Sequence, residues 1–401
     1  MDIVVFEIFS HLPAKSIFKF RIVSKQCHEN SSLVLLAFKQ CKNLESKEDL
    51  CFIIQPKNCE KVSPTNLQLN FLCETSKPFC GFPPPSLEFL STTGSILASS
   101  NGLLCCKNIG KAEYPIFLCN PVTKTWLPII KPTSYFNIDQ YQFSFVLACN
   151  VDHNREDDYI LMYAGPRPDV WDTSINLCKI YSPRKKAWEE SGEMVVGSRS
   201  IDFGSPAYLK NDGGTIYFMS DWNEYLTITK NRPFYWPYIV SYNIRNSISK
   251  FLKIPKPARK GVFKDHSSMF GVFKFKDPTT CRESICLIKL MKLVFSVWML
   301  TDINSSTWKL IMKSRSKAMG LYEYLKPTIS GFTVINGNLL LIATADQLYG
   351  YTLTGDLMKS SNVKRAVKIG WHGCGRDDVS FYSYSNTLRP CGDGAVPLPL
   401  K

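Results

Sequence analysis

A large apolar residue that follows a short polar turn recurs about every 60 residues through most of the chain. Trp126, Trp188, Ile248 and Trp308 are 62, 60 and 60 residues apart. Each turn separates two short segments rich in β-branched and aromatic residues, which is the pattern of an antiparallel hairpin. A hairpin that returns at a fixed spacing indicates that the chain is built from repeated structural units.

A second pair of predicted strands precedes each of these hairpins, so each unit contains four strands. Some of these pairs turn at Asn-Gly, which favours a two-residue hairpin loop. The predicted pairs are residues 96–99 with 103–107, 143–149 with 159–163, 207–210 with 215–220, 270–274 with 285–290 and 332–335 with 339–343.

Four-stranded units repeated at a fixed period are typical of a β-propeller, in which the sheets stack radially. Five units are visible, the last with outer strands at residues 348–352 and 357–359. Residues 50–73 and 379–384 can combine as a sixth, closing blade. A large double-sheet sandwich is the competing fold. We therefore expect a mainly β chain of about five to six four-stranded blades behind a small helical part.

The N-terminal residues have a helical pattern instead. Residues 3–12 predict a first helix that is apolar on most sides, and residues 31–47 predict a helical continuation. Pro13 can open a second helix and Ser24 can cap a third. Apolar residues follow Pro13 close to the helical period, at Ile17, Phe20, Val23 and Cys27. On this pattern alone, the helices could be a cap on the following domain.

Residues 12–25 read Leu-Pro-Ala-Lys-Ser-Ile-Phe-Lys-Phe-Arg-Ile-Val-Ser-Lys and closely resemble the F-box of plant F-box proteins. Two positions depart from the family pattern. Another Leu-Pro normally stands about ten residues earlier, ahead of Met1 here, and Cys27 takes the place of a tryptophan. The resemblance implies a three-helix unit, shortened at its N-terminus, that packs on a Skp-type adaptor. The residues it assigns to the adaptor contact, some of which must instead be internal core, are Leu12, Pro13, Ile17, Phe20, Val23 and Cys27.

Residues 100–105 and 119–126 resemble the opening of the plant F-box-associated domain, and residues 239–255 and 295–308 resemble its later repeats. That resemblance implies a kelch-like β-propeller that serves as an interaction domain. Kelch and WD-repeat propellers themselves fit less well, because Gly-Gly and Trp-Asp pairs are not repeated. The expected domains are an F-box-like helical domain at residues 1–45 and the F-box-associated propeller at residues 46–401.

The composition fits a folded protein that binds acidic partners. The net charge is +14, and the basic residues are spread in short groups, as expected of solvated loop tips. The N-terminus lacks the basic segment of a signal peptide, so the fifteen cysteines are expected to be reduced and mostly buried. No Cys or His spacing indicates a metal site, and no cofactor is expected. We expect an intracellular protein of the nucleus or the cytoplasm, with no membrane partner.

The motifs of catalysis are missing from the sequence. There is no Gly-rich phosphate loop and no Gly-x-Ser-x-Gly elbow. The adjacent carboxylates at residues 157–158 and 377–378 point in opposite directions when the backbone is extended, so they cannot act as a pair. We therefore expect a binding protein with no catalytic residues.

The connection at residues 221–238 is the candidate surface for substrate binding, because it is longer than a hairpin needs and rich in aromatic residues. The candidates are Trp222, Tyr225, Phe234, Tyr235 and Trp236. The alternative is that these rings fill gaps between blades.

The two resemblances together predict a non-catalytic subunit of an SCF (Skp adaptor, cullin, F-box) ubiquitin ligase. The helices would dock on the adaptor, and through it on the cullin, while the propeller holds an unknown target protein for ubiquitination. The alternative is an adaptor-independent propeller with a degenerate F-box, which binds protein or, given the charge, nucleic acid.

Overall fold

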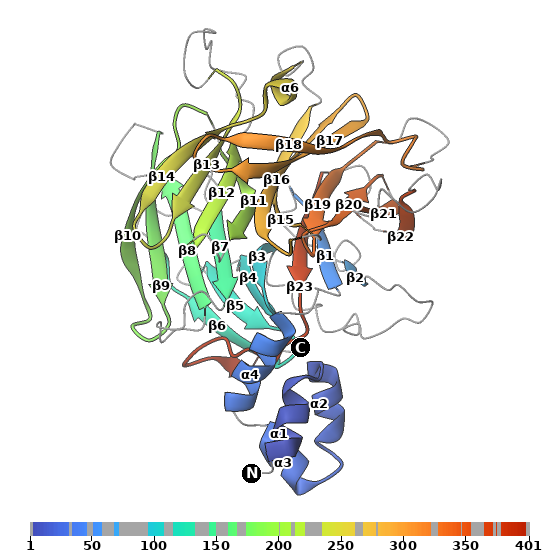
Figure 1. Cartoon of the computed structure of the whole chain (residues 1–401). Helices are drawn as coiled ribbons and strands as arrows, with labels where there is room; N and C mark the ends of the chain where they lie inside the picture. Colours follow the sequence, from blue (N-terminus) through green and yellow to red (C-terminus); the bar gives the residue numbers. More distant parts are fainter. Residues whose placement is uncertain are drawn as a thin grey trace.

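The computed structural model has four helices at one end and a β structure behind them (Figure 1). It describes residues 3–31, 34–45, 51–57, 68–71, 95–107, 115–132, 144–149, 159–166, 174–199, 201–209, 213–220, 235–260, 268–277, 280–321, 328–345, 347–353, 365–371, 374 and 378–397. The helices are α1 (Ile3–Ser10), α2 (Ala14–Phe20), α3 (Lys25–Ser31) and α4 (Val34–Glu45), with the short α6 (Lys256–Arg259) at the opposite end of the molecule.

Five sheets of the described chain each contain four consecutive strands, which we number as blades 1 to 5. Blade 1 has β3 (Ile96–Ser100), β4 (Leu103–Lys107), β5 (Ile116–Asn120) and β6 (Thr125–Ile129), to which β24 (Val396–Pro397) is added. Blade 2 has β7 (Ser144–Cys149), β8 (Tyr159–Pro166), β9 (Ile175–Ser182) and β10 (Ala187–Val195). Blade 3 has β11 (Ile201–Leu209), β12 (Thr215–Ser220), β13 (Tyr238–Asn243) and β14 (Ile248–Lys253). Blade 4 has β15 (Met269–Lys276), β16 (Glu283–Met291), β17 (Val294–Asp302) and β18 (Thr307–Arg315). Blade 5 has β19 (Gly331–Ile335), β20 (Leu339–Ala343), β21 (Gln347–Thr352) and β22 (Val367–Trp371).

A sixth sheet joins the two ends of the chain. It consists of β2 (Gln68–Phe71), β1 (Cys51–Pro56) and β23 (Val379–Tyr384), in that order. β1 and β23 are antiparallel over their whole length. The predicted combination of residues 50–73 with residues 379–384 is therefore confirmed, and this sheet is blade 6.

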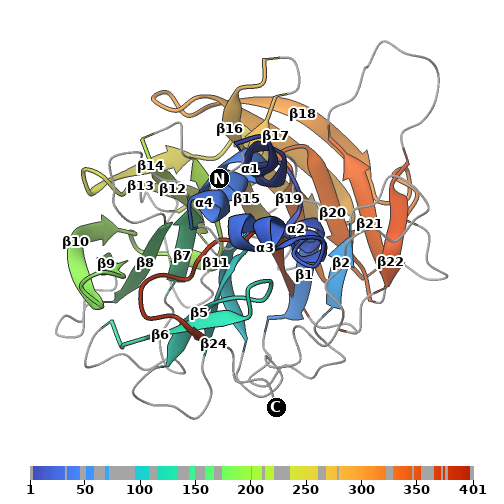
Figure 2. The same ribbon diagram turned by 90° about the horizontal axis from the view of Figure 1, so that it is seen from below.

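The six sheets form a closed ring. Their innermost strands follow one another around the axis in the order β3, β7, β11, β15, β19 and β23 (Figure 2). A separate apolar cluster fills the space between each pair of neighbouring blades. In a sandwich, two sheets share one core, whereas here every sheet buries both of its faces against different neighbours. The propeller prediction is confirmed, and the sandwich alternative is wrong.

The turn before the outermost strand has the same construction in blades 1 to 4. Its first residue accepts a backbone N–H of the turn on a side-chain oxygen, which fixes a tight bend. These residues are Asn120, Ser182, Asn243 and Asp302. Four positions later, each turn has a residue with positive φ, at Lys124, Lys186, Ser247 and Ser306.

This construction corrects the sequence repeat in blade 3. The residue two positions after the positive φ is Trp126, Trp188 or Trp308 in the other blades, but in blade 3 it is Ser249 and not Ile248. Ser249 also forms a hydrogen bond to the preceding blade, because its Oγ accepts the N–H of Val195 on the outermost strand of blade 2 at 3.0 Å. The indoles of Trp188 and Trp308 donate to Ile130 O and Lys253 O of the preceding blade, at 2.8 and 2.9 Å. Each of these three side chains therefore ties the rims of two neighbouring blades together.

The outermost strand of blade 5 also differs from the prediction. It is β22, which pairs with β21 from Gln347↔Trp371 to Gly350↔Val367. The strand predicted at residues 357–359 lies outside the described residues.

Residues 385–391, which we call the C-terminal segment, cross blade 1 at the helical end of the ring (Figure 2). Asn120 Nδ2 donates to Thr387 O at 3.0 Å and to Arg389 O at 2.7 Å. Thr387 Oγ1 donates to Asn101 O at 2.8 Å, and Tyr159 Oη donates to Cys391 O at 2.8 Å. These bonds satisfy backbone groups and hold the segment against blades 1 and 2.

The Asn101-Gly102 turn lies so close to this segment that there is no room for a side chain at Gly102. Gly102 has a φ of +89°, and a Cβ there would lie 2.0 Å from Thr387 Oγ1. We expect Gly102→Ala to lower the free energy of unfolding by about 2 kcal/mol or more, through backbone strain and overpacking. Urea denaturation followed by tryptophan fluorescence measures this loss. The control is Gly370→Ala, where a Cβ meets nothing within 4 Å; an equal loss there would contradict the close contact.

Candidate functional site

The four N-terminal helices pack around a small apolar core that the propeller helps to fill. Phe9 of α1, Ala14 and Ile17 of α2, and Leu36 of α4 are buried together with Leu388 of the C-terminal segment. Because Leu388 belongs to the same cluster, the helices are not a self-contained bundle. A unit of this size gains much of its stability from such packing on a larger domain.

Two local features fix the ends of the short helices. Pro13 precedes α2 with a φ of −58°, and Ser24 Oγ accepts the N–H of Cys27 at 3.1 Å, so the predicted cap of α3 is confirmed. Arg21 braces the turn between α2 and α3, since its Nε donates to Ser31 Oγ at 2.8 Å while its guanidinium lies 4.3 Å from the centre of the Phe18 ring. Burial lowers the pKa of Arg21, but a guanidinium remains charged at neutral pH.

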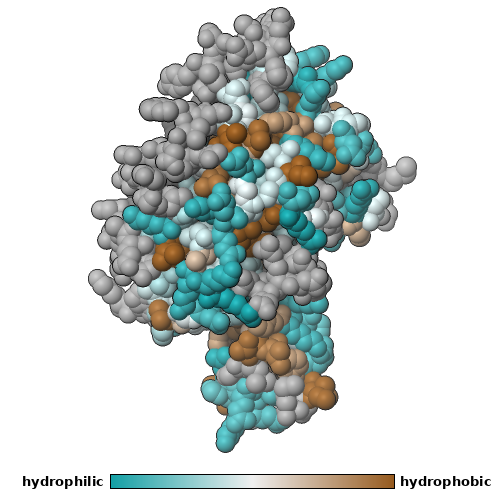
Figure 3. All heavy atoms as spheres, turned by 90° about the vertical axis from the view of Figure 1, so that its left-hand side faces the viewer, coloured by the Kyte–Doolittle hydropathy of each residue, from teal (hydrophilic) through white to brown (hydrophobic). Residues whose placement is uncertain are grey.

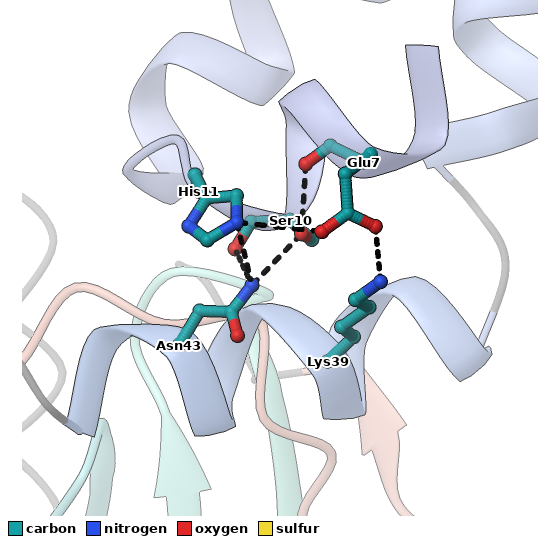
Figure 4. Close-up of polar contacts among 5 residues, drawn as sticks. All are labelled: Glu7, Ser10, His11, Lys39 and Asn43. Atoms are coloured by element: carbon teal, nitrogen blue, oxygen red, sulfur yellow. Dashed lines mark hydrogen bonds and ion pairs between the residues drawn. The ribbon is translucent and has the colours of Figure 1, made fainter. Parts of the chain in front are cut away.

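Polar contacts hold α1 to α4 on the outside of this core (Figure 4). Glu7 forms an ion pair with Lys39, and the hydrogen bond from that ammonium holds the pKa of the Glu7 carboxyl below its usual value. Asn43 Nδ2 donates to Ser10 Oγ at 2.8 Å and lies 3.4 Å from His11 Nε2. The contacts fix the register of α1 on α4 more than they add stability, because exposed ion pairs contribute little.

Gln40 joins the helices to the propeller. Its side chain is fully buried, with Nε2 donating to Leu12 O at 3.0 Å and Oε1 accepting the N–H of Leu388 at 2.9 Å. Asn101 Nδ2 donates to Cys41 O at 3.2 Å, and so ties blade 1 to α4 as well. Breaking the hydrogen bonds at both ends of a buried amide costs free energy, so the helical end is held in one orientation on the ring.

An exposed apolar surface lies on the helical end of the molecule. Brown, apolar residues are visible on this end in Figure 3. Its large side chains come from α1, from the end of α2 and the turn after it, and from α4. They are Ile3, Val4, Ile8, Phe20, Ile22, Val23, Val34, Leu35 and Phe38, and we call them the apolar helical surface. Exposed apolar side chains gathered on so small a unit make this surface a candidate interaction site.

The structure divides the six residues predicted to contact an adaptor. Phe20 and Val23 belong to the apolar helical surface, with 42% and 67% of their area exposed, and Leu12, Pro13 and Cys27 are half-buried. Ile17 is fully buried in the core of the helices. A direct partner contact by Ile17 is therefore not compatible with this packing; its role is to support α2.

Other exposed residues were missed from the sequence. Ile22 is 89% exposed and lies between Arg21 and Val23 in the turn after α2. Because this turn interrupts the helical period, Ile22 does not fall on the apolar spacing that includes Ile17, Phe20 and Val23. The exposed positions of α1 and α4 could have been found only by knowing which side of each helix faces the propeller.

Two of the five predicted substrate-binding residues lie within the described chain. Tyr235 and Trp236 are half-buried before β13, and their rings meet edge to face with centroids 4.9 Å apart. Tyr235 O accepts a hydrogen bond from Arg199, which is itself buried. This packing favours the alternative of rings that fill a gap in the scaffold at these two positions. The other three candidates, Trp222, Tyr225 and Phe234, lie outside the described residues.

The described residues contain no candidate metal site, disulfide or membrane-spanning helix. No group of His, Cys, Asp and Glu among them could hold a metal ion. Of the eleven cysteines whose side chains the structure describes, nine are buried and none forms a disulfide, and burial raises the pKa of Cys178 and Cys391 to about 12. No helix within the described ranges is long and apolar enough to cross a membrane.

Residues 2–34 match the model of the F-box domain. The chain is 21% identical over 403 residues to an F-box protein of Arabidopsis thaliana, and the alignment covers 97% of each chain. Similar solved structures include an oligogalacturonate lyase in complex with manganese (10% identity, TM-score 0.37, 72% of this chain and 68% of that chain). Another is Penicillium chrysogenum alpha-L-arabinanase complexed with arabinobiose (12% identity, TM-score 0.38, 71% of this chain and 89% of that chain). Residues 2–34, which contain α1 to α3, are thus an F-box domain. The sheets that follow in the chain form the β-propeller described above.

Matched substitutions of two isoleucines separate the core from the apolar helical surface. We expect Ile17→Ala to destabilise the helical end by about 2–5 kcal/mol, because it leaves a cavity in the core. Ile22→Ala should change stability by less than about 0.5 kcal/mol, because that side chain is already in solvent. Hydrogen exchange of α1 and α2 measures both effects. Equal protection in the two variants would contradict the assignment of Ile17 to the core.

Thiol reactivity checks the burial of the cysteines. At about pH 8, a thiol whose pKa is raised to about 12 carries almost no thiolate, and the thiolate is the reactive form. In the folded protein, iodoacetamide should therefore modify the exposed Cys281 and leave Cys178 and Cys391 unmodified until guanidinium unfolds the chain. Peptide mass mapping follows each site. Equal rates for Cys281 and Cys178 in the folded protein would contradict the buried position of Cys178.

Proposed function

We propose that this chain, an F-box domain joined to a β-propeller, is the substrate-recognition subunit of an SCF ubiquitin ligase. The F-box domain docks on a Skp-type adaptor and, through it, on a cullin. The propeller, which we assign to the F-box-associated type, recruits a target protein. In this proposal, residues 1–45 form the adaptor-binding part, residues 46–401 form the target-binding part, and the complex works in the nucleus or the cytoplasm.

The apolar helical surface is the observation that carries the proposal. It lies on the F-box domain itself, and Phe20 and Val23 belong both to it and to the segment that resembles the family pattern. Phe20 is also held in place, because its ring stacks on Phe9 at 5.7 Å between centroids. A fixed, half-exposed aromatic ring on an apolar surface is a common anchor of a protein interface.

The mechanism is proximity. The chain would supply no catalytic group, and the ubiquitin-charged enzyme of the complex would carry out the transfer. Tethering the target raises the effective concentration of its lysines at that enzyme. The firm attachment of the helices through Gln40 and Leu388 supports this role, because a fixed orientation keeps the target within reach.

Adaptor binding tests the proposal in the full chain. We expect co-purification with a plant Skp-type adaptor and its cullin. Replacing Phe20 and Val23 together by Ala should weaken adaptor binding by about tenfold or more, since it truncates anchors at the centre of the surface. Calorimetric titration with the adaptor measures the change, and circular dichroism checks the fold. The matched control replaces the exposed Val195 and Val367 of the propeller by Ala.

Unchanged adaptor affinity in the Phe20 and Val23 variant would refute the docking assignment. If the unsubstituted chain also failed to bind adaptor, the F-box domain would be degenerate. The protein would then be an adaptor-independent interaction propeller.

A further inference from the structure

The outer rim of two neighbouring blades carries a local excess of positive charge. Residues 243–260, around β14, contain six Lys or Arg residues, and residues 303–321, around β18, contain four. Neither range contains Asp or Glu. These ten residues are among the 48 Lys and Arg residues of the chain. We call the two ranges together the basic rim.

The charges of the basic rim point into solvent. On the two strands, the exposed basic residues are Lys250, Lys253, Lys309, Lys313 and Arg315. Within the described residues, none of these five forms an ion pair with a carboxylate. The rim of blade 2 is different, since β10 exposes Glu189, Glu190 and Glu193. The basic field is therefore local and belongs to blades 3 and 4.

The two strands form one continuous strip. The end of β14 touches the start of β18, because Lys253 N donates to Ser306 Oγ at 3.2 Å and the Trp308 indole donates to Lys253 O at 2.9 Å. β14 and β18 are also the outermost strands of their sheets among the described strands. Apart from the N–H and C=O of Lys253, which are bonded to blade 4, such an outer edge offers backbone donors and acceptors that can pair with an added extended chain.

Apolar side chains alternate with these cations. Ile248 and Leu310 are 51% and 50% exposed, and Phe251 is 36% exposed next to Lys250. This mixture favours a polypeptide over a nucleic acid. Single-stranded nucleic acids are bound by aromatic faces on which bases stack, whereas the aromatic rings here are engaged: Phe251 meets Tyr238 edge to face, and Trp308 is half-buried.

We infer that the basic rim binds an acidic segment of a partner protein, in which Asp or Glu residues alternate with aliphatic ones and the backbone is extended. Carboxylates of the segment would pair with Lys250, Lys309 and Lys313, while its aliphatic side chains would cover Leu310. The inference rests on the proposed function in naming the class of target, but binding at the rim does not need the adaptor. The two ideas can therefore fail separately.

The test is fluorescence anisotropy with the full chain and a labelled peptide of repeated Glu-Leu-Asp-Ser. A length of about 12 residues spans about 40 Å when extended, enough to cross the joint between β14 and β18. A Lys-Leu-Lys-Ser peptide and an oligo-dT strand of equal length are the reference probes. We expect the acidic peptide to bind tightest, with an affinity that falls as salt increases.

Charge reversal locates the binding. Replacing Lys309 and Lys313 together by Glu should weaken binding of the acidic peptide by about tenfold or more. The control replaces the exposed Lys57 and Lys131, on blades 6 and 1, by Glu. It changes the net charge by the same amount and should leave the affinity within about threefold, because exposed charges more than a Debye length away are screened. Leu310→Ser should weaken binding several-fold without any change of charge.

Three results would overturn the inference. They are equal losses in the two charge-reversal variants, no preference for the acidic peptide over the basic one, or tighter binding of oligo-dT that the Lys309 and Lys313 variant abolishes. The last would assign the basic rim to nucleic acid. Adaptor binding by the same variants keeps the two ideas apart. The rim variant should bind adaptor normally, and the Phe20 and Val23 variant should still bind the peptide.

Discussion

The pairing of β1 with β23 is the constraint on which the rest of the structure depends. A propeller is stable only if its first and last sheets meet, because each blade buries both faces against neighbours. Here the meeting takes place inside one sheet, since blade 6 takes strands from both ends of the chain. α4 ends six residues before β1 begins, and the C-terminal segment begins directly after β23. Closing the ring therefore brings α4 and the C-terminal segment to the same end of the molecule.

The attachment of the F-box domain follows from that closure. The C-terminal segment is held on blade 1 by Asn120 and Asn101, and it presents Leu388 to the helices. Gln40 then bonds both to Leu388 and to the loop before α2, so one buried side chain fixes two joints. The propeller thus stabilises the fold of the helices and also sets the direction in which their apolar surface faces.

The sequence predicted the architecture well because propeller units repeat, and each unit repeats the same turn chemistry. The sequence did not reveal that Ser249 is equivalent to the tryptophans. The repeat was identified from its apolar residues, whereas the structural position is fixed by the residue with positive φ two positions earlier. The sequence could not separate Ile17 from Phe20, since both lie on the apolar face of one helix and the packing of the whole cluster, Leu388 included, decides which is covered. The basic rim was also hidden, because Lys253 and Trp308 are 55 residues apart and meet only in the folded ring.

The shared core has a consequence for the order of synthesis. The F-box domain leaves the ribosome first, and domains generally fold as they emerge. Yet its core includes Leu388, and Gln40 finds its second partner in the backbone of that same residue. A chain that has not been translated as far as Leu388 therefore cannot complete its helical end, even if its blades have already folded. Only a chain translated beyond Leu388 can hold the apolar helical surface in its final form, so the two ends of the fold are completed together.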